Sequence, residues 1–188
     1  AWVRATSAGD AQLHLVRLPA EPPTTVAACS VRHGCLILDG LFSPHFLSEL
    51  CLLWRSLPIA VKDKASPIER SYYADTERWI SRQIDRAVKT ALDSISAPGE
   101  SRASAVTTAP LSRFLCYATP GGGLPAHVDL ARTWGGGLRS THSLLLYLTD
   151  CHQGGETLLL ETLAGDSAVG VVAGPRRTLE GVVPHRGR

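Results

Sequence analysis

Hydrophobic positions predict two amphipathic helices in the first half of the chain. The first begins at Ser43, which can cap a helix whose first position is Pro44, and it ends before Pro58. The second is predicted from about Thr76 to Ile95, with charged residues on its outer face. The apolar stripes at helical spacing are Phe46, Leu47, Leu50, Leu53, Trp54 and Leu57 in the first helix, and Ile80, Ile84, Ala87, Val88, Ala91, Leu92 and Ile95 in the second.

Short apolar runs separated by glycine-rich turns follow in the second half of the chain. The predicted strands are Cys35–Leu38 before the helices and, after them, Leu111–Ala118, Ser143–Thr149, Glu156–Glu161 and Ala168–Ala173. The turns between the later strands are Gly121–Gly123, Gly135–Gly137 and Gly154–Gly155. Helices followed by successive short strands predict a mainly β chain of the α+β class, an antiparallel sandwich or barrel with helices on one face. Residues 1–34, rich in Ala, Thr and Pro, are predicted to be an N-terminal extension or linker.

Composition indicates one folded domain in residues 35–188. The chain has 188 residues, 44% of them hydrophobic and 19% charged, which suits a single core. A formal charge of +2 does not favour nucleic acid as a partner, and no apolar run approaches the ~20 residues that a membrane span needs. The chain has no methionine and begins with Ala1, so we expect it to be a piece of a longer protein.

The cysteine pattern favours reduced thiols. Five cysteines at irregular spacing include no C-x-x-C pair, and three lie inside apolar runs. Buried free thiols are therefore expected rather than a disulfide framework. No secretory signal is visible, and both observations favour a reducing compartment such as the cytoplasm.

The most informative motif is His127-Val128-Asp129, which follows a predicted strand and the turn Gly121–Gly123. In an extended segment residues i and i+2 point to the same face, so this imidazole and this carboxylate can converge on one ion. Two histidines and one carboxylate form the facial triad of non-haem Fe(II) oxygenases. By itself the H-x-D pattern is also typical of a solvated histidine and aspartate beside a turn.

The context of the motif resembles the prolyl 4-hydroxylase-like branch of the Fe(II)/2-oxoglutarate dioxygenases. The matching order is a strand ending in Tyr117, a proline and glycine turn, the H-x-D motif, the apolar Ser143–Asp150 segment and the Gly154–Thr157 turn. The segment from Leu36 to Leu50 resembles the first strand and helix of that family. The resemblance implies a double-stranded β-helix, also called a jelly-roll or cupin-like fold.

The resemblance also implies an activity and its cofactors. Fe(II) and the cosubstrate 2-oxoglutarate would be used with molecular oxygen to hydroxylate an acceptor, most simply a prolyl residue of a protein or peptide, and succinate and carbon dioxide would be released. L-ascorbate commonly keeps the iron reduced in this family. His127 and Asp129 would be metal ligands, Tyr117 would bind 2-oxoglutarate, and Tyr147 is a second candidate for lining the same pocket.

The second histidine ligand is ambiguous. In one register His185 is the third ligand. In the other, which we favour, Val183–Arg188 is the turn before the last metal-bearing strand, and the third ligand lies beyond Arg188. In both registers the basic residue that anchors 2-oxoglutarate would follow Arg188, so the C-terminal strands of the domain are expected to be missing.

Two other interpretations of these motifs compete with a dioxygenase site. A zinc site could use His127 and Asp129 with His142 or His152, although neither of the last two has ligand spacing. A non-catalytic jelly-roll binding module that has lost a complete iron site would carry the same motifs. The sequence leaves the acceptor and the oligomeric state open.

Overall fold

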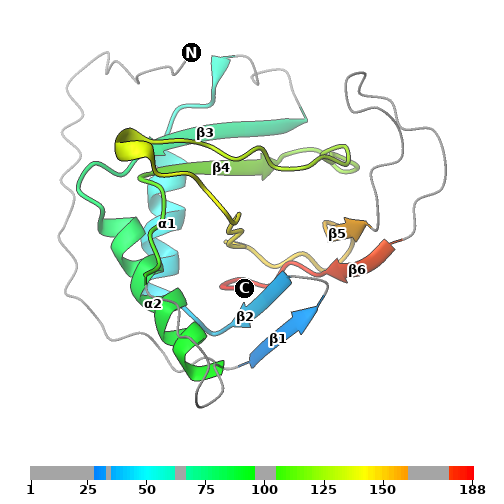
Figure 1. Ribbon diagram of the computed structural model, residues 1–188. Helices are drawn as coiled ribbons and strands as arrows, with labels where there is room; N and C mark the ends of the chain where they lie inside the picture. Colours follow the sequence, from blue (N-terminus) through cyan, green and yellow to red (C-terminus); the bar gives the residue numbers. More distant parts are fainter. Residues whose placement is uncertain (1–27, 33–34, 62–66, 96–104, 161–177) are drawn as a thin grey trace.

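The computed structural model describes residues 28–32, 35–61, 67–95, 105–160 and 178–188 of the chain. These residues form two α-helices and six β-strands, drawn in Figure 1: β1 (Ala28–Arg32), β2 (Cys35–Asp39), α1 (Pro44–Ser56), β3 (Ile68–Ala74), α2 (Trp79–Ile95), β4 (Leu111–Tyr117), β5 (Thr157–Leu160) and β6 (Thr178–Val182). The two helices lie on one side, and the strand pairs lie around the remaining sides.

Helix α1 has the bounds that its capping residues predict. The hydroxyl of Ser43 accepts a hydrogen bond from the backbone N–H of Phe46 at 3.2 Å, and Pro44 occupies the start of the helix. At the other end, the backbone N–H of Leu57 donates to the carbonyl of Trp54 at 3.1 Å. The residue before a proline avoids helical backbone angles, so Pro58 explains why the helix stops here.

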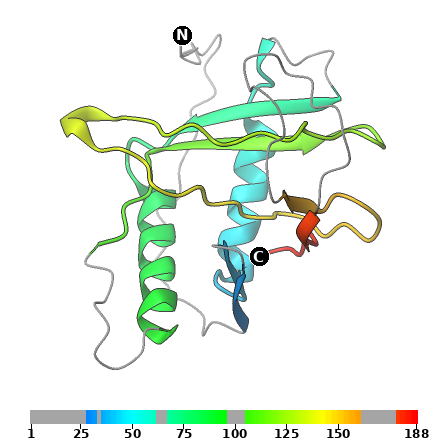
Figure 2. The same cartoon turned by 45° about the vertical axis from the view of Figure 1, so that its right-hand side comes forward.

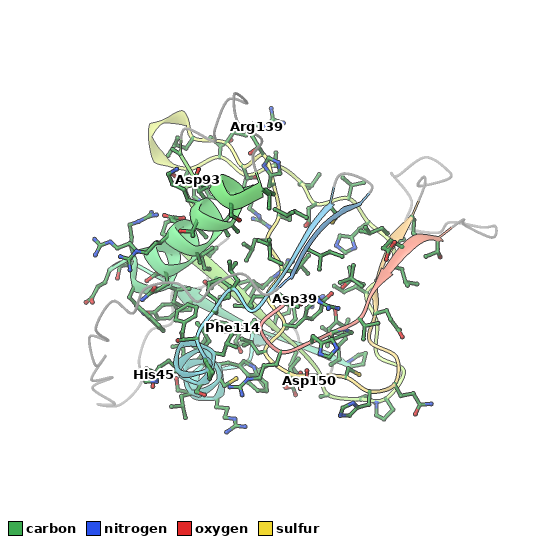
Figure 3. All side chains as sticks on the ribbon, turned by 90° about the horizontal axis from the view of Figure 1, so that it is seen from below. Asp39, His45, Asp93, Phe114, Arg139 and Asp150 are labelled. Carbon is green, nitrogen blue, oxygen red and sulfur yellow. The ribbon has the colours of Figure 1, made fainter. Side chains whose placement is uncertain are left out.

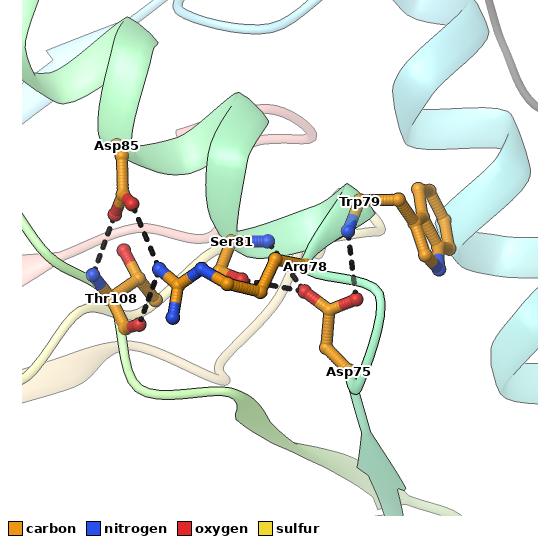
Figure 4. A network of polar contacts seen from close by, with 6 residues as sticks. All are labelled: Asp75, Arg78, Trp79, Ser81, Asp85 and Thr108. Atoms are coloured by element: carbon orange, nitrogen blue, oxygen red, sulfur yellow. Dashed lines mark hydrogen bonds and ion pairs between the residues drawn. The ribbon is translucent and has the colours of Figure 1, made fainter.

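Helix α2 begins three residues later than predicted, because Asp75, the residue after strand β3, caps the helix with its side chain. Its carboxylate accepts hydrogen bonds from the backbone N–H of Trp79 at 2.9 Å and of Ser81 at 2.7 Å, and from the Ser81 hydroxyl at 2.7 Å (Figure 4). Arg78, just before the helix, has a φ of +58°, which an L-residue adopts only at a cost. The guanidinium of Arg78 pairs with Asp85 at 3.1 Å.

The core lies between the two helices and the β3–β4 pair (Figure 2). Its buried residues come from α1, α2 and β4, and they are Phe46, Leu50, Leu53, Ile80, Ile84 and Phe114. Half-buried Leu146 and Leu148 pack against the same cluster, so the segment before Asp150 lies on this core. The predicted apolar stripes of both helices are confirmed at these positions.

The strands form three separate antiparallel pairs: β1 with β2, β3 with β4, and β5 with β6. In the part of the chain that is described, these pairs are not joined into one sheet, so the architecture there is a mixed α/β one with short antiparallel pairs. Strand β1 falls within the predicted extension 1–34 and pairs with β2 along its whole length. The predicted strand Ala168–Ala173 lies outside the described residues.

Among the described residues, Ser143–Thr149 is not a strand and no strand pairs with it, so the strand prediction for this segment is wrong there. Leu144 and Leu145 are 48% and 58% exposed. Instead Tyr147 makes two backbone hydrogen bonds to the C-terminal turn, accepting from the N–H of Gly187 at 2.8 Å and donating to the carbonyl of Arg188 at 2.9 Å.

The described residues also bear on the expectations about membrane spans and about cysteine thiols. In the described ranges, the helices are all too short or too polar to cross a membrane. Four cysteines there (Cys35, Cys51, Cys116 and Cys151) are free thiols, as expected, but they are half-buried rather than buried.

Candidate functional site

A tight turn separates β4 from the H-x-D motif. The backbone N–H of Gly122 donates to the carbonyl of Thr119 at 3.0 Å, and a Cβ at Gly122 would lie only 3.0 Å from that oxygen. A side chain at this position would force the carbonyl to shift by a few tenths of an ångström, so glycine suits the close approach. The chain then continues without regular structure to His127 and Asp129, whose side chains are both 51% exposed.

The imidazole of His127 is oriented by the backbone just before it. Its Nδ1 lies 2.8 Å from the carbonyl oxygen of Pro125. A carbonyl oxygen only accepts, so Nδ1 carries the proton and Nε2 of the neutral ring holds the lone pair. Histidine ligands of metal ions are typically held in this way, with the second ring nitrogen donating to a carbonyl or a carboxylate.

The carboxylate of Asp129 is oriented by the opposite side chain. The hydroxyl of Ser143 donates to Oδ2 of Asp129 at 2.6 Å. The other oxygen, Oδ1, lies 3.7 Å from Nε2 of His127. Each of the two side chains thus has one polar atom fixed by a neighbour and the other facing its partner.

Lone pairs of Nε2 and Oδ1 that pointed at each other at this distance would repel unless positive charge lay between them. A proton on Nε2 would supply it, and so would a metal ion. Two donors that each bind a metal at ~2.0–2.2 Å can be at most ~4.4 Å apart. The 3.7 Å separation of Nε2 and Oδ1 fits two ligands of one ion.

A third donor does not join this pair within the described ranges, where no group of three His, Cys, Asp or Glu side chains could hold a metal. His185 lies in the turn after β6, and its Nδ1 is 3.3 Å from Oδ1 of Asp150. The backbone N–H of Arg186 also donates to Asp150, at 2.8 Å, and chiefly this bond holds the pKa of that carboxyl below its usual range. The assignment of His185 as a ligand stays a prediction.

The two tyrosines named from sequence lie on different parts of the fold. Tyr117 is the last residue of β4, pairs in register with Ile68 and is 49% exposed. The hydroxyl of Tyr147 lies 2.6 Å from Oγ1 of Thr157 at the start of β5. This bond joins the apolar segment to the β5–β6 pair.

The remaining histidine and arginine candidates have other partners. His142 is exposed and its Nδ1 lies 2.8 Å from the Thr141 hydroxyl, and His152 is exposed in a turn. Arg188 binds both oxygens of Asp39 at 2.7 and 2.9 Å (Figure 3 shows Asp39 and Asp150 near the C-terminal segment). A shallow pocket beside this ion pair is lined by residues of β2, β6 and the C-terminal turn, and His127 and Asp129 do not line it.

Sequence reasoning missed Ser143 as a partner of Asp129, although the chain carries a signal for it. Residues 132–140 form a small hairpin, in which Thr133 and Arg139 make an antiparallel bridge and the N–H of Ser140 donates to the carbonyl of Arg132 at 2.9 Å. This register is centred on Gly136, and continuing it outward places Asp129 opposite Ser143. The glycine triplet of the turn therefore marks the centre from which the pairing can be counted.

Comparison with known proteins does not assign this chain to a family. No protein-family model matches this chain, and neither the curated proteins nor the solved structures include a match.

Proposed function

We propose that this chain belongs to an Fe(II)- and 2-oxoglutarate-dependent dioxygenase that hydroxylates an acceptor, for which a peptidyl prolyl residue is the first candidate. One observation carries the proposal: Nε2 of His127 and Oδ1 of Asp129 lie 3.7 Å apart. The other polar atom of each side chain has its own partner: Nδ1 of His127 lies against the carbonyl of Pro125, and Oδ2 of Asp129 accepts from Ser143. Bound iron would supply the site at which 2-oxoglutarate and oxygen react. His127 and Asp129 would hold it from one side and leave other positions open.

The proposed fold is the double-stranded β-helix. Short antiparallel strand pairs with two helices packed on one side support it, because this family of folds is built from short antiparallel strands. An experimental structure with iron bound would test it. Two facing sheets around His127 and Asp129 are expected across the complete chain, and a structure in which these two residues do not lie between facing sheets would contradict the fold.

The first experiment is an anaerobic titration with Fe(II) and 2-oxoglutarate, followed through the visible charge-transfer band expected of this family's chelate. With His185 as the third ligand, the unmodified chain should develop the band, and both His127→Ala and Asp129→Ala should abolish it. No band from the folded chain would favour the other register. His142→Ala is the matched control, since His142 is an exposed histidine bonded to Thr141 and should leave the band unchanged. An undiminished band in either pair variant would remove the assignment.

The same titration separates the two registers of the C-terminal turn. Loss of the band in His185→Ala would make His185 the third ligand. An unchanged band in His185→Ala would assign the third position to another group. Succinate release under oxygen then tests turnover with candidate peptides.

A second candidate function is a binding module that has kept the fold and lost the iron site. It is favoured by the lack of a third protein donor beside His127 and Asp129 in the described part of the chain. If the folded chain binds no Fe(II) and 2-oxoglutarate has no effect on its stability, the binding module replaces the enzyme.

A further inference from the structure

The hydrogen bond between Ser143 and Asp129 lies on the outward continuation of the register of a neighbouring hairpin. Thr133 and Arg139 pair as an antiparallel bridge, and Arg132 and Ser140 are joined by two bonds, N–H of Ser140 to the carbonyl of Arg132 and N–H of Arg132 to the Ser140 hydroxyl, both at 2.9 Å. Counting outward in the same register brings Asp129 directly opposite Ser143.

The hydrogen bond selects one carboxylate oxygen. Ser143 holds Oδ2 at 2.6 Å, and Oδ1 is left 3.7 Å from Nε2 of His127. Without a donor on Oδ2, this half-exposed carboxylate could rotate about its side-chain torsions and be hydrated on both oxygens. The hydroxyl therefore keeps Oδ1 in the direction that a shared ion requires.

We infer that Ser143 is a positioning residue of the metal site, which orients Asp129 through Oδ2 so that Oδ1 and His127 Nε2 present their lone pairs to one cation. This inference rests on the proposed function, because it concerns the same two ligands. Ser143 touches neither the ion nor a substrate. It contributes to metal affinity, because a carboxylate that is already ordered loses less conformational entropy when the metal binds.

The test is equilibrium titration of the full chain with Co(II), monitored through its visible ligand-field absorption. Ser143→Ala should weaken Co(II) binding by about 10- to 100-fold, the usual effect of removing a hydrogen bond that orients a metal ligand. Ser143→Thr keeps a hydroxyl at the same position and should restore most of the affinity. Ser143 is exposed, so its loss should not change the thermal unfolding midpoint of the metal-free chain.

The matched control is Thr141→Ala. Thr141 is an exposed hydroxyl two residues earlier, bonded to His142 at 2.8 Å, and its loss should leave Co(II) affinity unchanged. A double-mutant cycle tests whether Ser143 acts on Co(II) affinity through Asp129, which a purely structural role would not require. In the Asp129→Asn background, Ser143→Ala should change the residual affinity by less than twofold, because the ligand that it orients is already impaired.

The possible results distinguish the role of Ser143 from the existence of the metal site. Equal Co(II) affinity in Ser143→Ala and the unmodified chain would overturn the role of Ser143 and leave the metal pair standing. An equal effect of Ser143→Ala with and without Asp129 would also overturn it. Failure of the unmodified chain to bind either Co(II) or Fe(II) would overturn the metal site itself, and the positioning role with it.

Discussion

Asp75 shows how one buried carboxylate can set the start of a helix. It is 1% exposed, and its oxygens receive three hydrogen bonds, from Trp79 and twice from Ser81. Charge-assisted bonds and the positive end of the helix dipole offset the cost of removing the carboxylate from water. The direction of α2 from β3 into the core therefore depends on this side chain.

Replacing Asp75 with alanine should destabilise the chain by about 2–3 kcal/mol, because a helix cap is lost and buried N–H groups are left without partners. Chemical denaturation measures this loss. Asp93→Ala is the control: Asp93 pairs with Lys89 in a partly exposed i,i+4 ion pair at 2.9 Å, and its loss should cost about 0.5 kcal/mol or less. Equal effects of the two substitutions would contradict the capping role.

Tyr117 tests the cosubstrate part of the proposed function. Tyr117→Phe removes only the phenol hydroxyl from a half-exposed residue at the end of β4, so folding should be unaffected. The concentration of 2-oxoglutarate needed for half-maximal succinate release should rise about tenfold, as expected for one lost hydrogen bond to a charged group. An unaltered requirement would remove Tyr117 from the site.

At the scale of elements, the hairpin of residues 132–140 sets the register beneath the candidate site. Its turn needs positive φ at Gly136 (+80°) and Gly137 (+77°), whereas Gly135 has ordinary backbone angles. No atom lies within 4 Å of a Cβ built at any of the three. Substitution at Gly136 therefore acts through backbone strain alone.

Gly136→Ala should raise the free energy of the closed hairpin by about 1–2 kcal/mol. Amide hydrogen exchange should then quicken about five- to thirtyfold at Trp134 and Ser140, whose N–H groups close the hairpin. Gly135→Ala provides the control and should leave both rates near those of the unmodified chain. Faster exchange in Gly135→Ala as well would show that space, not φ, limits this turn.

Local signals predicted the helices, and non-local pairing explains what was missed. Ser43, Pro44 and the apolar stripe fix α1 without reference to the rest of the chain. Strand β3 has buried Ile68 and Ser71 three residues apart, so it lacks the alternation that marks a strand in sequence, and it exists because β4 pairs with it. The H-x-D pair follows from spacing alone, but its partner Ser143 follows from a hairpin register.

At the scale of the molecule, the turn after β6 joins segments far apart in sequence. Arg188 binds Asp39 of β2, Arg186 donates to the Ser48 hydroxyl of α1 at 3.1 Å, and a Cβ at Gly187 would lie 3.0 Å from a methyl group of Leu47. Hydrogen bonds from Arg188 hold the pKa of Asp39 below its usual value of 3.8. The ion pair therefore favours the folded state whenever Asp39 is ionised.

This lowered pKa has a defined consequence for stability against pH. Since Asp39 binds a proton less readily when folded, its contribution is complete above pH 3.8 and is lost as the pH falls through the folded-state pKa. Asp39→Asn should cost about 1 kcal/mol at pH 6, and the difference from the unmodified chain should shrink below pH 4. Urea midpoints at pH 6, 4 and 3 measure it, and a pH-independent difference would contradict the ion-pair origin.

The contact between Ser48 and Arg186 spans 138 positions, so the two residues are synthesised at well-separated times. At a synthesis rate of about 5–20 residues per second, Ser48 is added to the chain roughly 7–28 s before Arg186. The helices and the β3–β4 pair, all within residues 44–117, can pack during that interval, because their contacts are comparatively local. The surface of α1 that receives the turn is therefore uncovered by this contact until Arg186 has been made, and the turn can dock onto a helix whose core contacts are already in place.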